Sequence, residues 1–310
     1  MVNVKATVVA AFVLAGALIG NALFFFYVAV PGRYSNVSYS QVIESDLKAY
    51  EYLRNVPTHA TVLVTPESLP RHPRGLRVSS YYDLFERQLP LPQDAEYALI
   101  DFQALGSHLP VLKQPEAFSS SARDPFKIFQ WGLAGAADNL CLFQKGLQTP
   151  DRLYEVWSPG THSLPSSDLQ VFVAESVHLM GTRLGPDRVK PGETVRIRIG
   201  WVCVREPRQD FWLLLRLVDE EGRVLHQFKH PICYGLYPTS IWKSGQHISE
   251  DLWMIVPSWA HHRDAVVKAA VVSQAGHGGE SAPYLAHVES NRPDVFDAFG
   301  FWTLGRLTIE

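Results

Sequence analysis

The sequence predicts a single N-terminal transmembrane helix, then a small α/β domain and an antiparallel, immunoglobulin-like β-sandwich. Three observations predict this fold class. The chain is apolar and uncharged near its start, helix and strand patterns alternate in its first half, and apolar residues recur with a period of two in its second half. The predicted organisation is a membrane anchor over 1–37, the α/β domain over 38–150, a linker over 151–167 and the sandwich over 168–310.

The composition excludes several classes of protein. Apolar residues make up 46% of the chain, enough for a substantial core, whereas charged residues make up only 19%. The charged share lies below the ~25% of ordinary soluble proteins, which favours a membrane-embedded portion. The net charge of −3 argues against nucleic acid as a partner. Three cysteines are too few for a dense disulfide framework or a four-cysteine zinc site.

The uncharged segment from Ala6 to Val30 is long enough for a membrane helix, because about 20 apolar residues span the hydrocarbon core. A cleaved signal peptide is the alternative, but cleavage near residues 20–22 would leave an exposed apolar terminus. We expect an uncleaved anchor in a bacterial inner membrane, with the globular part in the periplasm. Small and polar residues could pack this helix against others, unless they are simply common in membrane helices: Ala11, Ala15, Gly16, Gly20 and Asn21.

The α/β domain is predicted from one amphipathic helix and several short apolar strands. The helix begins near a capping-box pattern at Ser38 and must end before Pro57. A second helix is expected over 126–133. Strands are expected over 61–65, 97–102 and 139–143. Because helices and strands alternate, we expect a mainly parallel sheet.

The sandwich is predicted from strict alternation of apolar and polar residues. Between Val195 and Cys203 every second residue is apolar, as in a strand with one buried face. A hairpin turn is expected at Asp219–Gly222, with glycine where the backbone needs a positive φ. Further strands are expected over 169–177, 248–256, 265–273 and 304–309. Seven short strands of this kind are typical of an antiparallel sandwich.

Three runs in the first half resemble part of a known family. They are Pro-Thr-His-Ala-Thr-Val-Leu-Val-Thr, Glu-Tyr-Ala-Leu-Ile-Asp-Phe and Leu-Cys-Leu-Phe-Gln-Lys-Gly. They resemble the extracytoplasmic C-terminal region of an uncharacterised family of polytopic bacterial membrane proteins similar to lipid-linked-sugar glycosyltransferases. The run from Tyr237 to Gly245, Tyr-Pro-Thr-Ser-Ile-Trp-Lys-Ser-Gly, resembles a strand corner in the β-sandwich module attached to such proteins. The sequence lacks their catalytic membrane body, so the resemblance does not imply transferase activity.

The histidines form no recognisable catalytic, cofactor-binding or metal-binding motif. His261 and His262, with His277 nearby, lack a third and fourth ligand at a suitable spacing. His226 and His230 lie four residues apart, but in a predicted strand they do not share a helical face. We therefore predict no catalytic, cofactor or metal site.

Cysteine and tryptophan supply the remaining candidate residues. Cys203 and Cys233 could form a disulfide in an oxidising compartment or remain two buried thiols. Trp242, Trp253 and Trp259 could stack on sugars or anchor a protein interface, or belong to the core.

These features favour a non-catalytic, single-pass, membrane-anchored structural or accessory subunit of a larger membrane complex, such as a photosynthetic or respiratory one. Its partners would be the lipid bilayer and other transmembrane subunits. The alternative is a carbohydrate-binding accessory protein of an envelope glycosyltransferase system. In neither case is the chain expected to be an enzyme.

Overall fold

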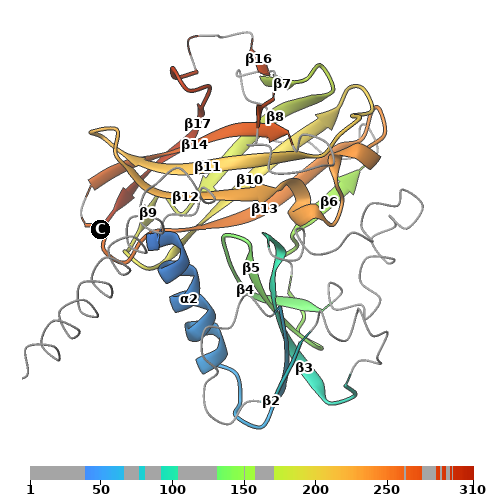
Figure 1. Ribbon diagram of the computed structural model, residues 1–310, viewed down its shortest axis with the longest axis vertical. Coiled ribbons are helices and arrows are strands. Elements are labelled where there is room, and N and C mark those ends of the chain that lie inside the picture. The colour runs from blue at the N-terminus through green and yellow to red at the C-terminus, as the bar shows by residue number, and fades with distance from the viewer. Residues whose placement is uncertain are drawn as a thin grey trace, which may run out of the picture. The chain divides into compact units, whose positions relative to one another are not determined.

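The computed structural model (Figure 1) describes residues 39–65, 77–80, 92–103, 131–149, 151–157, 171–261, 263–273, 284–286, 288–290, 294 and 296–310. Their elements are α2 (Tyr39–Arg54), β1 (Thr61–Val64), β2 (Arg77–Ser80), β3 (Ala95–Asp101), β4 (Gly132–Ala137), β5 (Leu140–Gln144), β6 (Tyr154–Trp157), β7 (Val171–Val173), β8 (Val177–Gly185), β9 (Arg188–Val189), β10 (Thr194–Cys203), β11 (Phe211–Asp219), β12 (Val224–Pro231), η5 (Ile232–Gly235), η6 (Thr239–Ile241), β13 (His247–Ile255), β14 (Arg263–Ser273), β15 (Tyr284–Leu285), β16 (Val288–Ser290) and β17 (Trp302–Ile309). The chain divides into two units, Met1–Ile43 and Glu44–Glu310. Every contact discussed below lies within the second.

The predicted fold class is wrong. The described residues are mainly β and form three sheets with a single α-helix among them. Within these residues no helix has the length and apolar character needed to cross a membrane. The predicted membrane helix falls outside the described part of the chain, together with its packing residues Ala11, Ala15, Gly16, Gly20 and Asn21.

The first sheet is mixed, whereas the sequence led us to expect a mainly parallel one. Its strand order is β2-β1-β3-β5-β4, with β1 parallel to both neighbours and β5 antiparallel to β3 and β4. The tight connection between β4 and β5 explains the difference, because a two-residue turn can join only antiparallel strands. Asp138 in this turn has a φ of 52°.

The second predicted helix is also wrong where it can be compared with the structure. Residues 126–130 lie outside the described part, and Leu133 belongs to β4. The small residues of Gly-Leu-Ala-Gly-Ala-Ala carry no periodicity that separates helix from strand, so pairing with β5 decides the outcome. The first predicted helix is present as α2, whose Ala49 and Leu53 pack on Val62 and Leu99.

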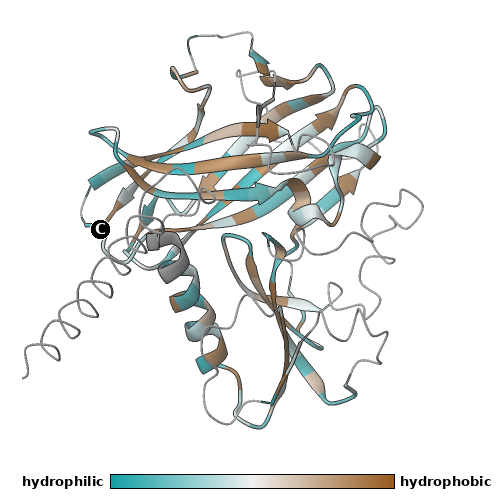
Figure 2. Ribbon diagram, in the orientation of Figure 1, coloured by the Kyte–Doolittle hydropathy of each residue, from teal (hydrophilic) through white to brown (hydrophobic). Residues whose placement is uncertain are grey.

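The other two sheets pack as a β-sandwich around one core. Their strand orders are β16-β7-β8-β10-β13-β6 and β12-β11-β14-β17-β9, with β15 added to β14. The alternation predicted for β10 is confirmed, because its inward-facing residues are fully buried: Val195, Ile197, Ile199, Trp201 and Cys203. Hydrophobic and hydrophilic residues both occur along the long strands (Figure 2), as expected when only one face is buried. The predicted hairpin is also present, and Gly222 has a φ of 80°.

The segment expected as a linker contributes a strand. Residues 154–157 form β6, which pairs antiparallel with β13 at the edge of the sandwich, where Glu155 lies opposite Ser249. Residues 158–167 lie outside the described part. The proline and glycine content of 151–167 could not reveal this strand, because the pairing depends on a partner about 95 residues away in the sequence.

Candidate functional site

A cavity of about 590 Å³ lies where the small sheet meets the sandwich. Its walls are formed by the start of β4, the segment over 147–149, β6 and Leu236, which directly follows η5. The aromatic lining residues are Trp131, Phe143, Tyr154 and Trp157, and the polar ones are Gln148, Thr149, Asp151, Arg152 and Glu155. Its volume falls within the range of about 300–1,000 Å³ that is typical of small-molecule sites. The cavity therefore combines flat apolar surfaces with groups that donate and accept hydrogen bonds.

A row of stacked rings supports the aromatic wall. Tyr154 stacks on Tyr237, with ring centroids 5.8 Å apart and planes 7° apart. Tyr237 in turn stacks on Trp242 at 6.3 Å and 21°. Trp242 is fully buried, and its indole N–H donates to the carbonyl oxygen of Tyr237 at 3.0 Å. The orientation of Tyr154 is thus fixed from the core outward.

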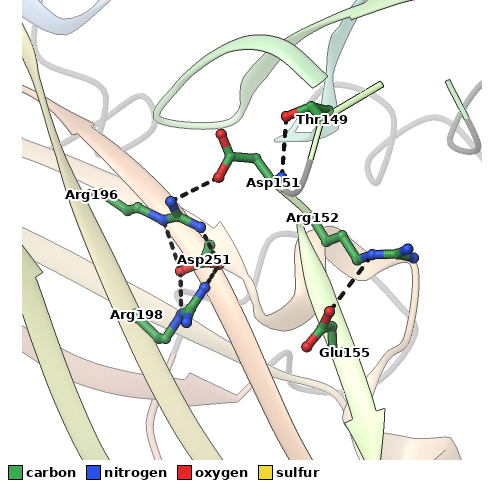
Figure 3. A network of polar contacts seen from close by, with 7 residues as sticks. All are labelled: Thr149, Asp151, Arg152, Glu155, Arg196, Arg198 and Asp251. Atoms are coloured by element: carbon green, nitrogen blue, oxygen red, sulfur yellow. Dashed lines mark hydrogen bonds and ion pairs between the residues drawn. The ribbon is translucent and has the colours of Figure 1, made fainter. Parts of the chain in front are cut away.

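A network of charged groups fixes the rim of the cavity (Figure 3). The carboxylate of Asp251 accepts two hydrogen bonds from Arg196, at 3.1 and 2.8 Å, and two from Arg198, at 2.9 and 2.7 Å. Arg196 also donates to Asp151 at 2.8 Å, and the backbone N–H of Asp151 donates to the hydroxyl of Thr149 at 3.2 Å. These bonds hold the chain in place as it enters β6.

Opposing effects act on the carboxyl group of Asp251. Burial raises its pKa, but the hydrogen bonds and charges of Arg198 and Arg196 outweigh burial and hold the pKa below its ordinary value. Asp251 is therefore ionised at neutral pH. Two guanidinium groups share this one carboxylate, and Arg196 also pairs with Asp151, so two arginines face two carboxylates here.

A second polar network is buried in the core and centres on Glu250, whose side chain has no exposed surface. This carboxyl group accepts hydrogen bonds from the indole N–H of Trp201 at 2.9 Å and the backbone N–H of Cys233 at 2.7 Å, and it contacts His230 at 3.2 Å. The backbone of Cys233 and Tyr234 has positive φ values of 54° and 57°, which side-chain-bearing residues rarely adopt. The bond to Glu250 helps to hold this strained turn.

The same network joins the small sheet to the sandwich. Asp138 lies 2.8 Å from the ring of His226 and accepts a hydrogen bond from the backbone N–H of Ile255 at 3.0 Å. Next to it, Asn139 lies 2.9 Å from the ring of His230. The β4–β5 turn is therefore tied to β12 and β13. Since the cavity has walls from both sheets, these contacts maintain its shape.

Our interpretation of the two histidines missed this network. His226 and His230 are buried on one face of β12, on either side of Phe228. A spacing of four residues marks a shared face in a helix, and our interpretation considered only that case. In a strand, residues two and four apart also share a face. The alternation of the predicted strand could therefore have placed both rings in the core.

The three candidate tryptophans differ in how far they are buried. Trp242 is fully buried, so of the alternatives left open for it the structure shows the core. Trp253 is half-buried, with the guanidinium of Arg196 5.3 Å from its ring centroid. Trp259 is 45% exposed and remains available on the surface.

The cysteine and histidine candidates form no joint site in the described chain. Cys203 and Cys233 are buried free thiols, so the structure contains two buried thiols and not a disulfide between them. His261 is exposed, whereas His262 and His277 lie outside the described residues. Among the residues that the structure describes, no group of three or more histidine, cysteine or acidic side chains is arranged to hold a metal ion.

Comparison with known proteins adds little to this geometry. Neither protein-family models nor curated proteins match the chain. Among solved structures, the C-terminal domain of Wzt is 8% identical with a TM-score of 0.28, covering 51% of this chain and 78% of that one. Spo0M, a sporulation control protein from Bacillus subtilis, is 13% identical with a TM-score of 0.25, covering 44% and 49%. Similarities this weak support no conclusion about function.

Proposed function

We propose that this protein is a non-catalytic accessory protein that binds carbohydrate in the cavity between β4 and β6. The observation that carries the proposal is the lining of that cavity by aromatic rings and by polar groups of both charge signs. Sugar rings present C–H groups that pack against the negative face of an aromatic ring. Their hydroxyl groups both donate and accept hydrogen bonds, and thus need mixed partners.

The ion pair at the rim suits this role. Arg152 and Glu155 lie 3.7 Å apart and both side chains are largely exposed. An exposed pair of this kind contributes only about 0–1 kcal/mol to stability. Both groups can therefore turn toward ligand hydroxyls at little cost.

The substitution Trp131→Ala tests the proposal. On an array of neutral oligosaccharides, wild-type protein should bind at least one, and the variant should bind it about 30-fold more weakly, because removing an aromatic anchor from a pocket costs about 2 kcal/mol. The matched control is Trp259→Ala, which removes an exposed ring outside the cavity lining and should leave binding unchanged. Circular dichroism spectra must show that both variants are folded. Equal binding by the wild-type protein and Trp131→Ala would refute the site.

A second function, as a structural subunit of a bacterial membrane complex on its periplasmic side, is favoured by a different observation. Leu47 and Tyr50 of α2 are each 52% exposed. Residues three apart share a helix face, so the two side chains form an apolar surface on α2. In this proposal the surface contacts another subunit, while the cavity plays no part.

The paired substitution Leu47→Ser and Tyr50→Ser tests this second proposal. Purification of the wild-type protein in mild detergent should retain a stoichiometric partner, and the variant should lose it because the apolar contact is removed. Val224→Ser changes an exposed apolar residue elsewhere and should leave the complex intact. A wild-type protein that is purified only as a monomer, or a variant that keeps its partner, would contradict the proposal.

A further inference from the structure

Two arginines face each other on the outer surface of the sandwich. Arg183 of β8 lies directly opposite Arg198 of β10 in the antiparallel register. Cross-strand partners project from the same face of a sheet. The neighbours of Arg198 along β10, Ile197 and Ile199, are fully buried, so the two arginines lie on the outer face. Arg183 is exposed, and the Arg198 side chain is 46% exposed.

Arg183 is the charge that the surrounding carboxylates leave unbalanced. The other arginines of this surface, Arg152, Arg196 and Arg198, are matched in number by Asp151, Glu155 and Asp251. Asp251 is shared between Arg198 and Arg196, and Asp151 is bound to Arg196. No acidic group lies within ion-pair distance of Arg183 in the described part of the chain. Arg198 uses only its Nε and Nη2 atoms on Asp251, so its Nη1 atom has no partner among the described residues. Like charges placed directly opposite each other destabilise a sheet, and a bound anion would relieve that repulsion.

The arginine pair and the cavity share a border. Asp151 and Glu155 both line the cavity. Asp151 is bonded to Arg196. The pKa of Arg198 is held above its ordinary value mainly by its hydrogen bonds to Asp251 and to a smaller extent by the charge of Glu155. Figure 3 shows Asp151 bonded to Arg196, and Glu155 paired with Arg152 on the neighbouring segment. A ligand that extends beyond the cavity on this side reaches Arg198 and, opposite it on β8, Arg183, whose charge has no ion-pair partner in the described chain.

We propose that the ligand is an acidic saccharide whose anionic group, a uronate carboxylate or a phosphate, binds Arg183 and Arg198 while its sugar rings occupy the cavity. This inference rests on the proposed carbohydrate-binding function and adds the charge of the ligand. Guanidinium groups suit such anions because two N–H donors match two oxygen acceptors. The arginines serve for recognition, and no bond in the ligand is made or broken.

Two matched pairs of probes test the inference by isothermal titration calorimetry. One pair is oligogalacturonate and its methyl ester, and the other is a phosphorylated oligomannose and its dephosphorylated form. Wild-type protein should bind the acidic member of one pair about 10-fold or more tightly than the neutral member. The pair that shows this preference identifies the anion as carboxylate or phosphate.

Arg183→Gln is the diagnostic variant, because Arg183 has no ion-pair partner in the described chain whose loss would disturb the fold. It should reduce the preference for the acidic probe to less than about 3-fold and leave binding of the neutral probe unchanged. Arg188→Gln makes the same change in net charge at an exposed arginine paired with Glu310, and it should retain the preference. Equal binding of acidic and neutral probes by wild-type protein, or an unchanged preference in Arg183→Gln, overturns this inference but leaves the proposed function standing. Binding of none of the four probes, together with no binding on the neutral array, overturns both.

Discussion

Replacing Glu250 by alanine is expected to lower the free energy of unfolding by about 3–5 kcal/mol, the range for removing one partner of a buried polar network. The carboxyl group is fully buried and accepts hydrogen bonds from the Trp201 indole and the Cys233 backbone. Alanine leaves both donors and the ring of His230 without their partner. Each unsatisfied buried group costs about 1–3 kcal/mol, and the space vacated by the side chain adds to the loss. Urea unfolding followed by tryptophan fluorescence measures the change.

Two further variants show whether the loss comes from these hydrogen bonds. Glu250→Gln keeps one acceptor oxygen but places an N–H₂ group where the second oxygen accepted, so its stability should lie between those of the alanine variant and the wild-type protein. Glu220→Ala removes an exposed carboxylate in the β11–β12 turn and should change stability by less than about 0.5 kcal/mol. If Glu250→Ala unfolds at the same urea concentration as Glu220→Ala, the buried network does not stabilise the fold.

The sequence predicted the strands of the sandwich because the signal for them is local. In β10 and β11 buried residues alternate with less buried ones, except at Gly200 and Val218, so alternation over a few residues is enough to predict a strand. The turn at Gly222 is equally local, since a positive φ favours glycine. These features need no knowledge of distant parts of the chain.

The sheet order and the cavity could not be predicted in the same way. The expectation of a mainly parallel sheet assumed a helix before β5, but β4 occupies the position beside β5. The cavity brings together Trp131, residues 147–157 and Leu236, which are far apart in the sequence and meet only through the pairing of β6 with β13. Composition could not decide between core and interface for Trp242 either. In the structure this ring is fully buried, whereas Tyr237 in the same motif is half-buried.

The last prediction contrasts two tryptophans that the sequence alone could not distinguish. Trp242→Ala is expected to destabilise the protein by about 3–5 kcal/mol, the usual cost of truncating a buried aromatic residue. The ring stacks on Tyr237, and its N–H satisfies the Tyr237 carbonyl. Trp259→Ala removes a ring that is 45% exposed and should cost less than about 1 kcal/mol. Urea unfolding followed by far-UV circular dichroism compares the two directly.

The same pair of variants tests how the core supports the cavity. Trp242 holds Tyr237, and Tyr237 stacks on Tyr154 in the cavity wall. Under conditions where Trp242→Ala remains folded, it should therefore bind saccharide more weakly than the wild-type protein, although Trp242 itself does not line the cavity. Trp259→Ala should bind like the wild-type protein. Unchanged binding by folded Trp242→Ala would show that the orientation of Tyr154 does not depend on the stacked row, and that the cavity wall is held by β6 alone.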